Sequence, residues 1–179
     1  EPGKDSLSPN RNLAPLTTEL DEQGRLMVGG CLLSDLASKY GTPLYVLDEK
    51  SLREACIAYR EALNRSYQGP SLPLYASKAN SSLLLSRLIS SEGFGIDVVS
   101  AGELLTALEG GVQGKNIVLH GNNKSEQELT LAYKNNVTIV VDNHYDLDRL
   151  ALIVSDKPKP ARLMLRFTPG IECHTHEYI

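Results

Sequence analysis

The chain has 179 residues, 41% of them hydrophobic and 22% charged, which is the composition of a globular domain with a real core and excludes a disordered tail. Its 18 basic and 22 acidic residues give a net charge of -4 and form no dense basic run, so no nucleic-acid partner is expected. No apolar stretch approaches the roughly 20 residues that span a bilayer, which argues against a membrane partner.

The compartment is predicted to be cytoplasmic. The N-terminus lacks the apolar region of a signal peptide, and the three cysteines, Cys31, Cys56 and Cys173, are widely spaced without a CxxC pair. This pattern indicates a reducing environment, because small secreted proteins use paired cysteines as a disulfide framework.

Three regions are expected along the chain. Residues 1–15 are polar and contain three prolines, which predicts a flexible lead-in. Residues 16–47 are assigned to the N-terminal segment of a β domain, with a hairpin over 16–28, a helix over 31–40 and a short strand over 43–47. The third region is 48–179, and Asp48 is predicted to cap its first helix.

From residue 72 onward, strand and helix patterns alternate. Strands are predicted at 72–76, 94–99, 117–119, 137–141 and 163–167, and helices at 81–91, 101–109, 125–135 and 145–155. Such alternation is typical of α/β proteins with a parallel sheet and right-handed crossovers.

A doubly wound sheet and part of a (β/α)8 barrel both fit this alternation. A doubly wound nucleotide binder carries a glycine-rich turn after its first strand, whereas that junction here is Ser77-Lys78-Ala79-Asn80. Polar side chains follow every predicted strand: Lys78; Asp97 and Ser100; His120, Asn122 and Asn123; Asp142, Asn143 and His144; and Arg166. Barrel active sites lie at that end of the strands, so the pattern favours a TIM barrel of which about the first five β/α units are present.

Lys78 is the candidate reactive residue. It follows the apolar run Pro73-Leu74-Tyr75-Ala76, which predicts a short buried strand that carries the lysine to the rim of the core. Desolvation there would lower the pKa of the ammonium and suit the amine to covalent chemistry with an aldehyde. The residues alone leave an ordinary surface lysine at a strand end equally open.

A metal site is not expected. Cys173, His174, His176 and Glu177 are metal-ligating residue types, but no second ligand group at a matching spacing accompanies them. His120 and His144 are interpreted as polar residues at the barrel mouth, not as metal ligands.

Four motifs in order closely resemble the diaminopimelate decarboxylase family, which belongs to the alanine racemase-like, fold type III enzymes that use pyridoxal 5'-phosphate. They are Tyr75-Ala76-Ser77-Lys78-Ala79-Asn80, the segment 93–104, the segment 120–125 and Arg166-Phe167-Thr168-Pro169-Gly170; residues 174–179 also resemble this family. The resemblance implies a barrel that carries the cofactor, a separate β domain to which the N-terminal segment belongs, and a homodimer with active sites near the subunit interface.

The resemblance also assigns roles. Lys78 would hold the cofactor aldehyde covalently, Asp97 would lie close to Lys78, and Arg166 would lie near the ring hydroxyl, where a cation stabilises a phenolate-like oxygen. The implied reaction is decarboxylation of meso-2,6-diaminopimelate to L-lysine, the last step of lysine biosynthesis. From the residues alone, Asp97 could instead cap a helix and Arg166 could form a rim salt bridge, while Ser100 and Glu103 are explained as an N-cap and a first-turn acid.

The chain is expected to be an N-terminal fragment. In the family, the segment that grips the cofactor phosphate, the acid that pairs with the pyridinium nitrogen, the histidine that stacks on the ring, and the interface cysteine and tyrosine all lie further downstream. We therefore expect this chain alone neither to hold the cofactor tightly nor to turn over substrate. Two alternatives stay open: another amino-acid decarboxylase or racemase of the same fold, and a non-catalytic cofactor-binding module.

Overall fold

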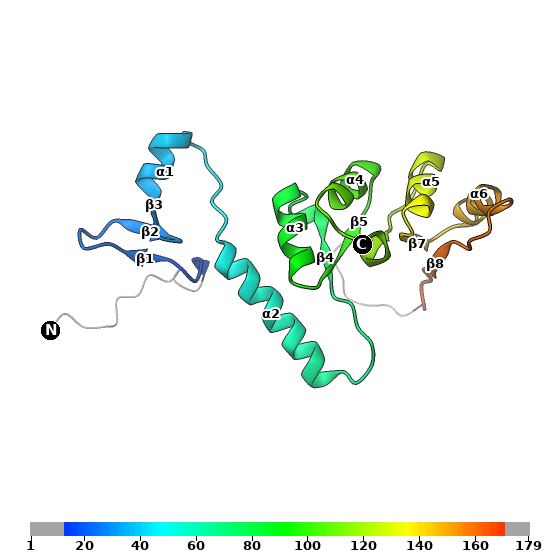
Figure 1. Cartoon of the computed structure of the whole chain (residues 1–179), viewed down its shortest axis with the longest axis horizontal. Coiled ribbons are helices and arrows are strands. Elements are labelled where there is room, and N and C mark those ends of the chain that lie inside the picture. Colours follow the sequence, from blue (N-terminus) through cyan, green and yellow to red (C-terminus); the bar gives the residue numbers. More distant parts are fainter. Residues whose placement is uncertain (1–12, 171–179) are drawn as a thin grey trace. The chain divides into compact units, whose positions relative to one another are not determined.

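The computed structural model describes residues 13–170, and the chain divides into two compact units, residues 1–68 and 69–179 (Figure 1). Residues 1–12 of the predicted lead-in lie outside the described residues. No helix within 13–170 combines the length and the apolar character needed to cross a membrane.

The first unit contains a small antiparallel sheet and two helices. Its elements are β1 (Glu19–Leu20), β2 (Leu26–Val28), β3 (Cys31–Leu32), α1 (Leu33–Tyr40) and α2 (Glu49–Ser66), with the strands in the order β1-β2-β3. The predicted hairpin is confirmed. Its turn is closed by Asp21, whose carboxylate accepts a hydrogen bond from the backbone N–H of Arg25 at 2.8 Å and pairs with the Arg25 side chain at 2.7 Å.

Two predictions in this unit are wrong. The helix expected from residue 31 begins at Leu33, because Cys31 pairs with Val28 in the sheet. The strand expected over 43–47 does not form, and Tyr45 within it is 97% exposed. An apolar run becomes a strand only where a neighbour offers backbone hydrogen bonds, and no described strand pairs with this one.

The predicted cap of α2 is confirmed. Asp48 accepts hydrogen bonds from the backbone N–H of Ser51 at 3.1 Å and from its hydroxyl at 2.5 Å, and the hydroxyl bond is the main reason that the pKa of Asp48 is lowered. Grouped by contacts, α2 falls in the first unit, whereas the sequence assigned it to the barrel region. The boundary between the regions stays a prediction.

The second unit is a five-stranded parallel sheet with helices between its strands. The strands, β4 (Leu74–Ala76), β5 (Gly95–Val98), β6 (Ile117–Leu119), β7 (Thr138–Val141) and β8 (Arg162–Leu165), lie in sequence order. The helices are α3 (Leu83–Ser91), α4 (Ala101–Glu109), α5 (Glu126–Lys134) and α6 (His144–Val154), with short 3-10 turns η2 (Ser77–Ala79) and η3 (Gly114–Asn116). All nine predicted strands and helices are confirmed, with ends shifted by two residues or fewer.

Each of these four helices begins at a side-chain cap. Ser82, Ser100, Ser125 and Asn143 accept hydrogen bonds from the backbone N–H groups of Leu85, Glu103, Glu128 and Asp146, respectively. The predicted roles of Ser100 and Glu103 are therefore confirmed. Such caps satisfy N–H groups that a helix leaves unpaired at its start, so they fix where the chain turns from strand to helix.

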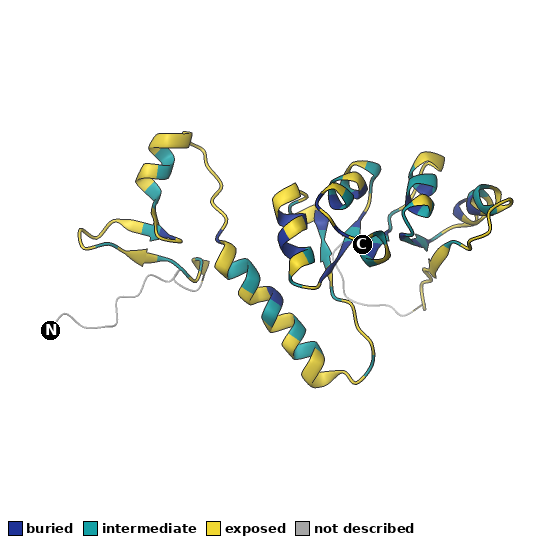
Figure 2. Cartoon of the chain, viewed as in Figure 1, coloured by how far each residue is buried: buried dark blue, intermediate teal, exposed yellow. Residues whose placement is uncertain are grey.

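The helices cover one face of the sheet. Each helix from α3 to α6 contacts the next, as expected when sequential strands are joined by crossovers of one hand. Strand residues alternate accordingly: Ile96, Val98, Ile117, Leu119 and Ile139 are almost fully buried, whereas Asp97, Val118, Thr138 and Val140 are half-buried (Figure 2). A doubly wound sheet would carry helices on both faces, so the architecture is that of a barrel wall.

A glycine pair tests the packing of β5. A Cβ at Gly95 would collide with the backbone carbonyl of Asn116 and lie 2.6 Å from the Leu74 side chain, so we expect Gly95→Ala to lower the free energy of unfolding by about 1–3 kcal/mol. The control, Gly102→Ala in α4, meets nothing closer than 3.9 Å and should raise it by about 0.5 kcal/mol. Urea unfolding followed by circular dichroism measures both, and equal midpoints for the two variants would contradict the packing.

Candidate active site

Three polar side chains meet at the carboxyl end of neighbouring strands. Ala76 of β4 lies opposite Asp97 of β5, and Asp97 lies opposite Val118 of β6. Lys78 follows Ala76 by two residues, and His120 follows Val118 by two. Because residues two apart in a strand point to the same face, His120 lies on the same side of the sheet as Asp97. We call Lys78, Asp97 and His120 the carboxyl-end cluster.

Asp97 and His120 are in direct contact. The Nε2 atom of His120 lies 3.0 Å from Oδ2 of Asp97, and the two side chains are 37% and 27% exposed. The backbone positions His120 as well, because its N–H donates to the carbonyl of Val98 at 2.9 Å. A half-buried imidazole–carboxylate pair of this kind can hold or pass a proton.

Partial burial raises the pKa of Asp97, and the charge and hydrogen bond of His120 offset this only in part. The carboxylate of Glu103 raises the pKa of Asp97 further, while the charge of Lys78 lowers it. Lys78 and Asp97 are therefore near enough for their charges to interact. A carboxyl group with a raised pKa beside an amine is a common feature of catalytic sites.

One expectation for Lys78 is wrong. Its side chain is exposed, so the burial expected to desolvate the ammonium is absent. The reason is its place in the fold: β4 is the outermost described strand on its side of the sheet, and it contains only three residues. No carboxylate of residues 13–170 lies within 4.0 Å of the Lys78 amine.

Arg166 is not part of the carboxyl-end cluster. It follows β8, where its backbone N–H donates to the carbonyl of Val141 at 2.9 Å, and its side chain is exposed. Four strand spacings separate β8 from β4, which is roughly 19 Å measured along the sheet. The structure thus brings together two of the three residues proposed for the cofactor, Lys78 and Asp97, and places Arg166 on a distant strand.

A buried ion-pair group supports the same edge of the sheet and was not predicted. Nζ of Lys124 lies 2.7 Å from Oδ2 of Asp146 and 3.3 Å from Oδ1 of Asp142, and it donates to the carbonyl of Gly121. Lys124 is 2% exposed and Asp146 is 0% exposed. Burial raises the pKa of Asp142, but the hydrogen bond and charge of Lys124 outweigh this and lower it overall. The group joins the β6–α5 loop to the β7–α6 loop.

The sequence carried only a weak signal for this group. Asp142 and Asp146 are spaced by four residues, but Lys124 lies in a polar loop that would ordinarily be solvated. Nothing in its neighbours indicates burial.

The remaining candidates for metal binding form no site in the described part of the chain. His144 is the exposed first residue of α6. Cys173, His174 and His176 lie outside the described residues. Within residues 13–170, no three His, Cys, Asp or Glu side chains are grouped so that they could hold a metal ion.

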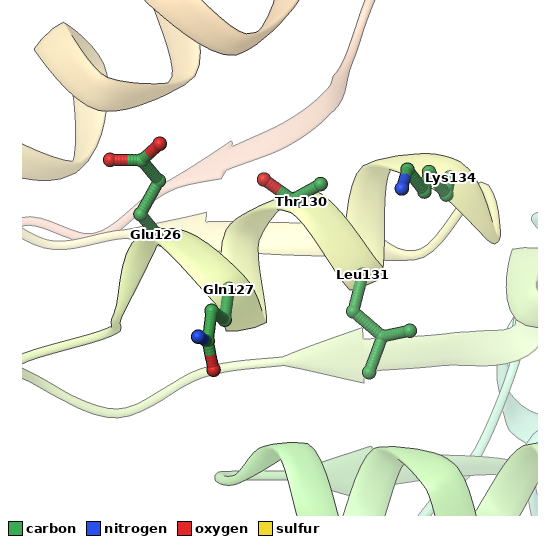
Figure 3. A pocket seen from close by; sticks show the side chains of 5 residues that line it. All are labelled: Glu126, Gln127, Thr130, Leu131 and Lys134. Atoms are coloured by element: carbon green, nitrogen blue, oxygen red, sulfur yellow. The ribbon is translucent and has the colours of Figure 1, made fainter.

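A hollow of about 530 Å³ lies over α5. Its lining side chains all come from this one helix, as Figure 3 shows: Glu126, Gln127, Thr130, Leu131 and Lys134. None of them belongs to the carboxyl-end cluster, so this hollow is not the candidate active site.

With the geometry established, sequence comparison decides the family. The sequence pattern of the family described as "Pyridoxal-dependent decarboxylase, pyridoxal binding domain" matches residues 49–179. The chain belongs to this pyridoxal-dependent decarboxylase family. It is 47% identical to a diaminopimelate decarboxylase of Synechocystis over 97% of its own length, and 44% identical to one of Bacillus methanolicus over 91%. It spans 39% and 38% of those two proteins.

Solved structures of the pyridoxal-dependent decarboxylases support the fold. Diaminopimelate decarboxylase from M. jannaschii matches 89% of this chain with a TM-score of 0.81 and 34% identity, and the match covers 38% of that protein. The Helicobacter pylori enzyme complexed with L-lysine matches 82% with a TM-score of 0.73 and 32% identity, over 36% of its length. The predicted fold class is confirmed: the five-stranded sheet matches part of the alanine racemase-like TIM barrel.

The residues of the carboxyl-end cluster fit the cofactor of this pyridoxal-dependent family. Lys78 offers an exposed primary amine, which an aldehyde carbon can reach, and the neighbouring carboxyl group of Asp97 has a raised pKa and can hold a proton. Arg166 offers an exposed guanidinium on the fifth strand of the sheet. These groups suit the aldehyde and an anionic oxygen of pyridoxal 5'-phosphate.

Replacement of Lys124 tests the buried ion-pair group. In Lys124→Met, Asp146 stays buried without a cation, so we expect the free energy of unfolding at pH 7 to fall by about 3–5 kcal/mol. Lys115→Met removes an exposed lysine and should change it by less than about 0.5 kcal/mol. Urea unfolding measures both.

The same variant has a predicted pH dependence. The lowered pKa of folded Asp142 means that its stabilising contribution is present above the unfolded value of 3.8 and is lost as pH falls through the lower folded value. The difference between wild type and Lys124→Met should therefore narrow at that acidic end. A difference that is small at pH 7 would contradict the structural role.

Replacement of Asp97 tests its raised pKa. A folded-state pKa above the unfolded value means that the ionised carboxylate costs stability at pH 7, a cost that disappears as pH falls below the unfolded value of 3.8. We therefore expect Asp97→Asn to raise the urea midpoint at pH 7.

The matched control is Asp21→Asn. The backbone hydrogen bond from Arg25 is the main cause that lowers the pKa of Asp21, so this variant should shift the midpoint in the opposite direction, downward. A lower midpoint for Asp97→Asn than for wild type at pH 7 would show that the ionised carboxylate stabilises the fold.

Proposed function

We propose that this chain is the N-terminal, cofactor-binding part of a pyridoxal 5'-phosphate-dependent carboxy-lyase that converts meso-2,6-diaminopimelate into L-lysine and carbon dioxide. The observation that carries the proposal is the exposed amine of Lys78 at the carboxyl end of β4, beside the Asp97–His120 pair. Relatives named diaminopimelate decarboxylase with 41–47% identity support the substrate.

Lys78 is the proposed catalytic residue. Its Nζ attaches to the aldehyde carbon of the cofactor, and water leaves. The bound cofactor supplies an electron-withdrawing ring that accepts the electron pair left when carbon dioxide departs. Before attachment, Nζ has to give up a proton, and the Asp97 carboxyl, whose pKa is raised by burial, is the nearby group that can hold it.

Arg166 is proposed to bind the cofactor from the other side of the barrel mouth. In a ring of eight strands, the fifth strand is halfway round from the first, so the ends of β4 and β8 face each other across the mouth. Separation along the sheet therefore does not prevent Lys78 and Arg166 from approaching one ligand. The guanidinium would stabilise the phenolate-like ring oxygen.

The remaining parts of the proposal concern the whole protein. L-lysine is the ligand named for the M. jannaschii and H. pylori structures, and we extend it to this protein as the product. A homodimer with active sites near the subunit interface follows from the family resemblance. A cytoplasmic location is supported by the wide spacing of the cysteines.

Another amino-acid substrate is the second candidate, because related decarboxylases share the fold. A lysine/ornithine decarboxylase from Vibrio vulnificus and an arginine decarboxylase from Paramecium bursaria Chlorella virus match with TM-scores of 0.60, at 23% and 19% identity. These identities support the fold alone. Carbon dioxide release from meso-diaminopimelate, L-ornithine and L-arginine, compared side by side in the full-length protein, separates the two candidates, and a non-catalytic module would release none.

Chemical trapping tests the attachment site. Full-length protein is incubated with pyridoxal 5'-phosphate, reduced with borohydride and analysed by peptide mass spectrometry. We expect the reduced adduct on Lys78, its complete loss in Lys78→Ala, and no change in Lys115→Ala, which removes an exposed lysine next to the opposite end of β6. An adduct confined to another lysine, or no adduct, would sink the proposal.

A further inference from the structure

The Asp97 carboxylate has two cationic neighbours but contacts only one of them. Its Oδ2 lies 3.0 Å from Nε2 of His120. The charge of Lys78 reaches Asp97 and lowers its pKa, yet within residues 13–170 the two side chains form no ion pair at 4.0 Å or less. Asp97 is therefore held by His120 on one strand end while the amine on the other strand end stays apart from it.

The other charged group beside Asp97 does not compete for this position. Glu103, in the first turn of α4, is an anion whose Oε2 already accepts a hydrogen bond from the backbone N–H of Val99 at 2.8 Å. Lys124 is occupied by Asp142 and Asp146. The groups that act on Asp97 are thus His120, Glu103 and Lys78, and only His120 and Lys78 can pair with it.

We propose that His120 is a positioning residue that holds the Asp97 carboxylate and so prevents it from forming an ion pair with Lys78. This inference rests on the proposed function of Lys78 as the attachment point. Neither imidazole nor carboxylate bonds covalently to anything in this role; His120 fixes where the negative charge lies.

The consequence for Lys78 follows from the chemistry of amines. Only the unprotonated amine attacks an aldehyde, and an ion pair with a carboxylate stabilises the ammonium form. If Asp97 were released from His120, it could swing to Lys78. For a partly exposed pair, this would reduce the fraction of free amine about two- to five-fold at a pH below the pKa of the lysine.

The experiment measures the reactivity of Lys78 without the cofactor. Full-length protein freed of pyridoxal 5'-phosphate is treated with trinitrobenzenesulfonate, which modifies free amines, at a series of pH values, and the labelling rate of Lys78 is determined by peptide mass spectrometry. The readout is the midpoint of the pH profile, which a loss of folding stability alone does not move.

The variants separate charge, hydrogen bond and position. His120→Ala frees Asp97, and the midpoint should rise by about half a pH unit. His120→Gln keeps an N–H donor for Asp97, so the midpoint should return to the wild-type value. His144→Gln changes an exposed histidine at the start of α6 and should have no effect. In an Asp97→Asn background, His120→Ala should no longer shift the midpoint.

An unchanged midpoint in His120→Ala, or a shift that persists in the Asp97→Asn background, would overturn the inference. Thermal melting followed by circular dichroism confirms that each variant is folded, and His120→Asn, whose shorter side chain does not reach Asp97 in the same way, replaces the alanine variant if that one unfolds.

Failure of the proposed function is recognised separately. In that case, borohydride traps no pyridoxal adduct on wild-type Lys78, whereas the trinitrobenzenesulfonate profiles still report whether His120 keeps Asp97 away from the amine.

Discussion

The register between β4, β5 and β6 is the constraint on which the candidate site depends. It places Ala76, Asp97 and Val118 in one row, so the residues just beyond them, Lys78 and His120, flank the carboxylate of Asp97. A slip of one residue would turn Asp97 toward the helices and replace it with the buried Ile96 or Val98. Burial of the alternate strand residues under α3 to α6 therefore specifies the polar cluster as well as the core.

Electrostatics divides this edge of the sheet into two parts with different tasks. Lys124, Asp142 and Asp146 form a group in which a buried cation is matched by carboxylates, and it holds two loops together. Lys78, Asp97 and His120 are more exposed and less completely paired, which leaves the Lys78 amine accessible. The first arrangement stabilises the fold, whereas the second keeps ionised groups available for chemistry.

Coverage of one sheet face explains why the fold suits a pyridoxal-dependent decarboxylase. With helices on one side only, the half-buried face that carries Asp97 is left for the interior and mouth of a barrel, where a cofactor can be reached from several strand ends. The exposed apolar side chains of Leu163, Met164 and Leu165 on β8 lie at the edge of this sheet. Their exposure is consistent with a match to only part of the barrel in the related structures.

The sequence by itself determined the order of strands and helices in the second unit, the helix caps, and Lys78 and Asp97 as candidates, because these depend on local periodicity, on capping side chains and on ordered motifs. It failed where partners distant in the chain decide the outcome. Residues 43–47 lack a neighbouring strand, Lys78 is exposed on the outermost described strand, and Lys124 is buried against Asp146. Only the tertiary structure decided that Asp97 is held by His120, since parallel pairing brings together strand ends that local pattern does not relate.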